Sequence, residues 1–98
     1  MEKLDIVNPG EILNEDFIKG FGITAYKLAK ETNIPATRIS DIIKGRRKIT
    51  ADTALRFSKF FGNSAEFWLN IQNEFELRKE KELLEEELRK ITKIQKVG

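Results

Sequence analysis

The stretch that most constrains the fold is residues 24–48, TAYKLAKETNIPATRISDIIKGRRK. Its apolar residues recur at helical spacing on both sides of the tripeptide Asn-Ile-Pro at 33–35. Ala29 is small where two helices would cross closely, and the proline is tolerated because it falls at the entrance of the second helix. The pattern predicts two short helices, 25–32 and 36–44, joined by a tight turn. This is the layout of a helix-turn-helix, whose second helix is placed to enter the DNA major groove.

Capping residues predict three further helices. Residues 8–11, Asn-Pro-Gly-Glu, offer an N-cap, a proline at the first helical position and a glutamate at the third. A threonine cap and an acidic first turn open a helix over 51–61, which Gly62 ends. Ser64 or Asn63 caps the next helix. The apolar residues expected to supply the core of these helices are Ile12, Leu13, Phe17, Ile18, Ala54, Leu55, Phe57, Phe60, Phe61, Phe67, Trp68, Leu69, Ile71 and Phe75. The sequence therefore predicts an all-α fold of five helices. The aromatic residues are interpreted as core, and the alternative is that several of them form part of a dimer contact.

The composition shifts to Glu, Lys and Arg from residue 74 onward. Opposite charges four residues apart support a helix here, and the pairs are Glu74/Arg78, Glu85/Arg89 and Glu86/Lys90. We therefore expect the fifth helix to continue or a sixth to follow, and we divide the chain into a helix-turn-helix DNA-binding domain at 1–78 and a charged C-terminal helical extension at 79–98. A narrow apolar stripe consists of Leu77, Leu84, Leu88, Ile91 and Ile94. Such a stripe must be buried, either against the domain or against a partner, and both interpretations stay open.

The chain contains neither cysteine nor histidine. Disulfides, thiolate metal sites and the commonest general base are therefore excluded. The carboxylates gather on a solvated helix, and no phosphate-cradling glycine loop or metal-spaced cluster is visible. We expect no enzyme activity, no metal and no cofactor. No apolar run approaches the roughly 20 residues that span a bilayer, and the N-terminus does not resemble a signal peptide, so we expect a cytoplasmic protein without membrane contact.

Residues 38–48 carry five cations and one acidic residue. A basic block of this kind is the electrostatic footprint of phosphate binding, as on nucleic acid. A solvated surface loop is the alternative, and charge alone does not decide between the two.

Four runs of the sequence resemble the HigA/VapI-type antitoxins of the lambda-repressor-like (XRE) helix-turn-helix family. They are PGEIL (9–13), LAKETNIPATRISDIIKGRR (28–47), ITADTALRFSKFFG (49–62) and FWLNIQ (67–72). The resemblance covers residues 8–78 and implies a homodimer that binds a palindromic operator of double-stranded DNA in its own promoter. It also implies a small toxin partner, typically an mRNA-cleaving ribonuclease, that the chain neutralises. The alternatives are a stand-alone transcriptional regulator without a toxin, and an interaction module that has lost DNA binding.

The resemblance also implies which residues face the bases, namely Ala36, Thr37, Arg38, Ser40 and Asp41 at the start of the second motif helix. The Arg38 guanidinium can bond O6 and N7 of guanine together, and Thr37 can bond a base or a phosphate. Asp41 can accept from cytosine, or it can form a salt bridge with Arg38 one turn away.

The remaining candidates are expected to contact phosphates, which position a protein without specifying sequence. They are Lys44, Arg46, Arg47 and Lys48 after the second motif helix, and Thr24, Tyr26 and Lys27 at the opening of the first. Burial is the alternative for Tyr26. For Arg46 or Arg47 the alternative is a side chain turned back toward the helix ends. The dimer interface stays open, and the toxin surface is expected at residues 1–8, the first helix or the extension.

Overall fold

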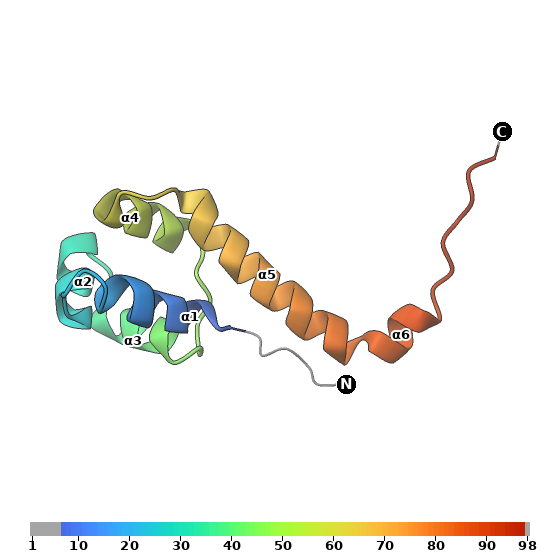
Figure 1. Ribbon diagram of the computed structural model, residues 1–98, viewed down its shortest axis with the longest axis horizontal. Helices are drawn as coiled ribbons and strands as arrows, with labels where there is room; N and C mark the ends of the chain where they lie inside the picture. Colours follow the sequence, from blue (N-terminus) through green and yellow to red (C-terminus); the bar gives the residue numbers. More distant parts are fainter. Residues whose placement is uncertain (1–6, 98) are drawn as a thin grey trace.

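The computed structural model describes residues 7–97 and contains helices and no strand within that range. In chain order the elements are α1 (Pro9–Ile12), the π-helix η1 (Leu13–Ile18), α2 (Ala25–Thr32), α3 (Ala36–Ile43), α4 (Ala51–Phe61), α5 (Ala65–Leu83) and α6 (Glu85–Arg89) (Figure 1). α1 and η1 follow each other without a break, so the expected five-helix all-α domain is confirmed. The wide π-helical turns were not expected. α6 is a short addition after the fifth helix.

The predicted helix boundaries follow the capping residues closely. α2 and α4 begin and end at the predicted residues, and their N-caps are the hydroxyls of Thr24 and Thr50. α3 ends one residue early because Lys44 is its C-cap, and Gly45 follows with a φ of 76°. Ser64 caps α5 by accepting a hydrogen bond from the N–H of Phe67 at 3.0 Å, which decides between the two predicted caps.

The core lies where α1, η1, α2, α3, α4 and the first half of α5 meet. Its fully buried large side chains are Leu13, Leu28, Ile39, Ile42, Ile49, Phe57 and Trp68. The ring of Trp68 lies 4.6 Å from that of Phe17, centroid to centroid, and its Nε1–H donates to Asn63 Oδ1 at 3.0 Å. The aromatic cluster is therefore core, as expected. Leu55 was wrongly predicted to be core: it is 62% exposed because Ala54 and Phe57 face inward and leave it on the solvent side of α4.

The C-terminal part of the chain projects away from this core. α5 extends beyond the domain as a rod, the chain turns at Leu84, and residues 91–97 carry no regular structure (Figure 1). The radius of gyration is 17.1 Å, against about 13 Å for a compact domain of this length. The interpretation that the extension lies against the domain is therefore wrong for residues 77–97, whose side chains are all exposed.

Two of the three expected side-chain pairs of this C-terminal part form, and one is replaced. Glu74–Arg78 and Glu85–Arg89 form at 2.7 and 3.8 Å. The expected Glu86–Lys90 pair is replaced by pairs three residues apart, Glu86–Arg89 at 3.1 Å and Glu87–Lys90 at 3.6 Å. α6 has only five residues, too short for a regular ladder of pairs four apart. Across residues 7–97, no helix combines the length and hydropathy required to cross a membrane.

Candidate nucleic-acid interface

α3 is held so that one of its faces is buried and the opposite face is free. Ile39 and Ile42 point into the core and are almost completely buried, whereas Ala36 and Thr37 are exposed. Gly10 at the start of α1 allows a close approach to the end of α3, because a Cβ there would collide with the carbonyl oxygens of Ile42 and Ile43. Packing therefore fixes α3 along its buried face and at its C-terminal end.

The other three predicted base-facing residues are partly buried on the flanks of α3. These residues are Arg38, Ser40 and Asp41. Neither an ion pair nor a side-chain hydrogen bond joins Arg38 to Asp41 within residues 7–97, so the alternative of a salt bridge does not hold in this structure. Arg38 Nε is buried and has no hydrogen-bond partner in the described chain. Buried polar atoms normally have partners, so this nitrogen is an exception. Arg38 is only partly buried, and within residues 7–97 its side chain forms no ion pair.

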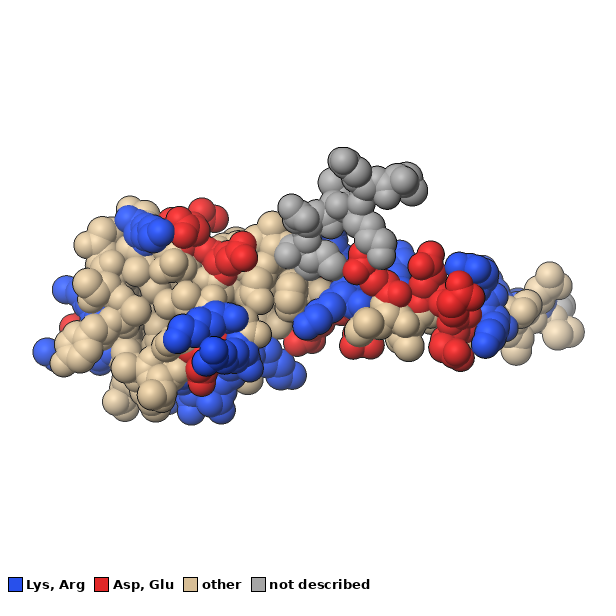
Figure 2. All heavy atoms as spheres, turned by 90° about the horizontal axis from the view of Figure 1, so that it is seen from below, with Lys and Arg blue, Asp and Glu red and all other residues tan. Residues whose placement is uncertain are grey.

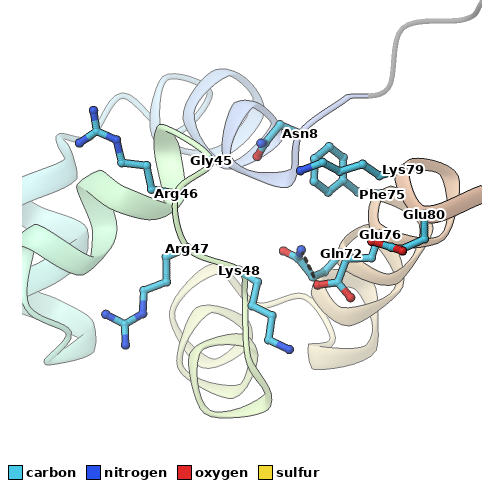
Figure 3. Close-up of a pocket in the computed structure, with 10 residues that line it drawn as sticks. All are labelled: Asn8, Gly45, Arg46, Arg47, Lys48, Gln72, Phe75, Glu76, Lys79 and Glu80. Carbon is cyan, nitrogen blue, oxygen red and sulfur yellow. Dashed lines mark hydrogen bonds between the residues drawn. The ribbon is translucent and has the colours of Figure 1, made fainter. Parts of the chain in front are cut away.

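The four cations that follow α3 form what we call the basic loop, Lys44–Lys48. All four cationic side chains are exposed, while the backbone is fixed. The N–H groups of Arg46 and Arg47 donate to the carbonyl oxygen of Asp41 at 2.8 and 3.3 Å. Both guanidinium groups point away from the hollow between the loop and α5 (Figure 3), and within residues 7–97 neither has a side-chain partner. The alternative that one of them turns back to the helix ends is therefore wrong for this structure.

A second view shows the charge of this surface. Figure 2 shows the molecule from below the view of Figure 1, which is the side on which α3 lies. Lys and Arg side chains gather on this face of the domain. The exposed N-terminal end of α3 and the basic loop after its C-terminal end thus belong to the same short segment of the chain, residues 36–48.

The opening of α2 adjoins the start of α3. Thr24 Oγ1 accepts from the N–H of Lys27 at 3.0 Å, and Lys27 itself is exposed. Tyr26 is 71% exposed, so the alternative that it is buried is wrong. A shallow hollow is lined by Tyr26, Pro35 and Ala36 among others. The fold therefore brings Tyr26, one of the predicted phosphate-contacting residues, beside Ala36 at the predicted base-facing end of α3.

Two residues that support this surface were not identified from the sequence. Arg56 Nη1 donates to the carbonyl oxygens of Thr32 and Asn33 at 3.0 and 3.4 Å, and Arg56 Nε donates to Asp52 Oδ1 at 2.7 Å. Arg56 therefore ties α4 to the turn between α2 and α3, where Asn33 has a φ of 55°. In the sequence, the spacing of four residues between Asp52 and Arg56 indicates an ion pair within one helix, but it does not indicate the bonds from Arg56 to the turn.

The second overlooked residue is Gln72, which is buried on α5. Its Oε1 accepts from the N–H of Ile49 at 2.9 Å, and its Nε2 donates to Glu76 at 3.2 Å (Figure 3). The bond from the N–H of Ile49 to Gln72 fixes the end of the basic loop against α5. An available signal was the glutamine in the run FWLNIQ, a polar residue on an otherwise apolar helix face.

Known proteins with similar sequences identify the family. The family model described as Helix-turn-helix matches residues 16–68. Virulence-associated protein I of Dichelobacter nodosus is 42% identical over 76 residues, which span 78% of this chain and 70% of that protein. Antitoxin HigA-1 of Vibrio cholerae is 37% identical over 71 residues, spanning 72% of this chain and 67% of that protein. The chain belongs to the HigA/VapI family of helix-turn-helix antitoxins.

Solved structures agree with this family assignment. The antitoxin HigA of Pseudomonas aeruginosa, solved with the higBA promoter, has a TM-score of 0.88 and 32% identity. The match covers 93% of this chain and 100% of that chain. The HigA/VapI family consists of DNA-binding antitoxins and regulators rather than enzymes, and this agrees with the absence of enzyme activity expected from the sequence.

Proposed function

We propose that this HigA/VapI protein is an operator-binding antitoxin. In this proposal a homodimer binds a palindromic operator in its own promoter, represses the operon, and neutralises a small ribonuclease toxin that the operon encodes. The observation that carries the proposal is the exposed N-terminal end of α3 together with the four exposed cations on the fixed backbone that follows the C-terminal end of the same helix. The promoter-bound HigA of Pseudomonas aeruginosa has the same fold, which supports the DNA-binding part.

The proposed base contacts come from the start of α3. α3 enters the major groove, with Ala36, Thr37 and Arg38 nearest its tip and Ser40 and Asp41 on its flanks. Arg38 would donate two hydrogen bonds to a guanine, an interaction worth about 1–3 kcal/mol of discrimination. Arg38 is only partly buried and forms no ion pair within residues 7–97, which supports this role.

The proposed phosphate contacts flank that helix on both sides. The basic loop supplies Lys44, Arg46, Arg47 and Lys48 on one side. On the other side, Thr24, Tyr26 and Lys27 present side chains and helix N–H groups at the opening of α2. These contacts would give affinity and fix the orientation of α3 without reading sequence.

Two copies are required for selective binding, since one copy presents a single recognition helix. Half-sites read by a dimer lie about 34 Å apart, or one helical turn of DNA. A dimer bound across the promoter would block transcription of the operon by occupying it. The proposed site of action is the cytoplasm, where the operator lies.

The repressor part is tested with a reporter gene fused to the DNA upstream of the operon. Expression of the chain in trans should lower reporter output, and Arg38→Ala should relieve this repression without loss of the protein. An unchanged reporter at normal protein levels would contradict the repressor role.

The toxin part is tested separately, by co-expressing the chain with the small protein encoded beside it. Growth should be restored relative to expression of that neighbour alone. If growth is not restored although both proteins are present in the soluble fraction, the antitoxin role fails. A stand-alone transcriptional regulator with the same DNA-binding residues would then remain.

A further inference from the structure

The hollow between α2 and the start of α3 has a largely apolar lining on the surface that is proposed to face DNA. Its floor is made by Ala29 and Ile34, which are 6% and 3% exposed. Its rim includes the rings of Tyr26 and Pro35 and the methyl group of Ala36, and all three residues are exposed. Apart from the Tyr26 hydroxyl, these side chains carry neither a hydrogen-bond donor nor an acceptor.

Helical spacing places Tyr26 on the side of α2 that lines this hollow. Residues 26, 29, 30 and 33 follow the spacing of one helix face, and all four line the hollow. Tyr26 is 71% exposed, although an aromatic ring gains most from burial. Its apolar surface is therefore available at the edge of the proposed DNA interface.

The polar lining of the hollow is compatible with DNA. Lys30 and Asn33 complete the lining, and both are exposed. Lys30 brings a cation, and none of the described residues that line this hollow is acidic. A second hollow lies between α2 and α4, and its lining includes the acidic residues Glu31 and Asp52. Because DNA is a polyanion, its charge favours the first hollow over the second.

Base edges in the major groove offer a single apolar group. Thymine presents its C5-methyl group there, whereas the other groups that the bases present are hydrogen-bond donors and acceptors. Pro35 and Ala36 have no side-chain group that could satisfy those donors and acceptors. Burying a polar base edge without a partner is unfavourable, whereas burying a methyl group is favourable. The chemistry of the hollow therefore favours thymine.

We propose that this hollow receives the C5-methyl group of one thymine in each operator half-site, and that Tyr26 is a specificity-determining residue. The Tyr26 ring covers the methyl group from the side of α2, while Pro35 and Ala36 cover it from the side of α3. This inference rests on the proposed operator binding. To the proposed phosphate contact of Tyr26 it adds a contact that reads sequence.

The experiment replaces thymines of the upstream DNA with deoxyuridine, which lacks the C5-methyl group and pairs in the same way. Fluorescence anisotropy of the full-length protein is measured on duplexes in which thymine is replaced at one position of each half-site, position by position. Replacement at one position is expected to weaken wild-type binding about fourfold per half-site, which corresponds to about 0.8 kcal/mol for one methyl group. Replacement in both half-sites should weaken binding by about 16-fold.

Variants of α2 show whether Tyr26 is responsible. Tyr26→Ala should bind the unmodified operator more weakly and should no longer distinguish thymine from deoxyuridine at that position. Tyr26→Phe should keep the distinction because it retains the ring. The matched control is Lys27→Ala, which removes the neighbouring exposed side chain and should weaken binding to both duplexes by the same factor. All three substitutions are at exposed positions, so a thermal melt should show folded variants.

Three outcomes overturn the inference while operator binding holds. The first is a protein that prefers its upstream DNA to a scrambled duplex but is sensitive to deoxyuridine at no position. The second is a sensitivity that persists in Tyr26→Ala, and the third is one that is lost in Tyr26→Phe, because the hydroxyl rather than the ring would then be responsible. Equal binding to the upstream and scrambled duplexes would instead contradict operator binding itself, and the inference would fail with it.

Discussion

Replacing both Arg46 and Arg47 with alanine should weaken DNA binding without weakening the fold. Both guanidinium groups are exposed and lack side-chain partners within residues 7–97, whereas the backbone N–H groups that fix the loop remain in the variant. Each phosphate contact contributes about 0.9 to the slope of log affinity against log salt, so the slope should fall by about 1.8. Between about 50 and about 200 mM salt, the wild-type affinity should then drop by about 12-fold more than the affinity of the variant.

The measurement is fluorescence anisotropy on the upstream DNA at several salt concentrations, together with a thermal melt. Arg56→Ala is the matched control because that arginine bonds to the carbonyl oxygens of Thr32 and Asn33. This variant should lose about 1 kcal/mol of unfolding free energy, which corresponds to a fall of about 4–8 °C in Tm. Its slope of log affinity against log salt should equal that of the wild type. An unchanged slope in the double variant, or a Tm loss equal to that of Arg56→Ala, would refute the reasoning.

Three further changes test other parts of the interface. Gln72→Met leaves the buried N–H of Ile49 without an acceptor and should cost about 1–3 kcal/mol in urea unfolding; an unchanged midpoint would show that this bond is dispensable. Gly10→Ala forces a methyl group into the carbonyl oxygen of Ile42 and should cost about 1–3 kcal/mol, a loss that a thermal melt would detect or refute. Arg38→Ala should lower affinity for the operator by about 1–3 kcal/mol and leave affinity for a scrambled duplex nearly unchanged; equal losses on both duplexes would make Arg38 a phosphate contact.

The domain was predictable because its helix ends are marked locally. Threonine caps and a terminal glycine or asparagine define α2 and α4, and these signals act over a few residues. The exposure of Leu55 was not predictable in the same way, because adjacent positions on α4 fit the helical period almost equally well. The inward face is fixed only when Ala54 and Phe57 pack against the rest of the core.

The supporting bonds of the interface were invisible for a different reason. Arg56 reaches a carbonyl 24 residues earlier, and Gln72 accepts from an N–H 23 residues earlier. Such bonds depend on how helices pack, and no local spacing encodes them. For the extension the sequence left two interpretations of the apolar stripe open, and only burial against the domain is wrong, because the stripe remains uncovered within one copy of the chain.

The most direct test of the central claim is anisotropy of the purified full-length protein on its own upstream DNA. A scrambled duplex of the same length and composition is titrated beside it across a salt series. The proposed function predicts nanomolar binding to the upstream DNA, much weaker binding to the scrambled duplex, and a steep salt dependence. Weak and equal binding to both duplexes would contradict it, because α3 and the basic loop would then not read an operator.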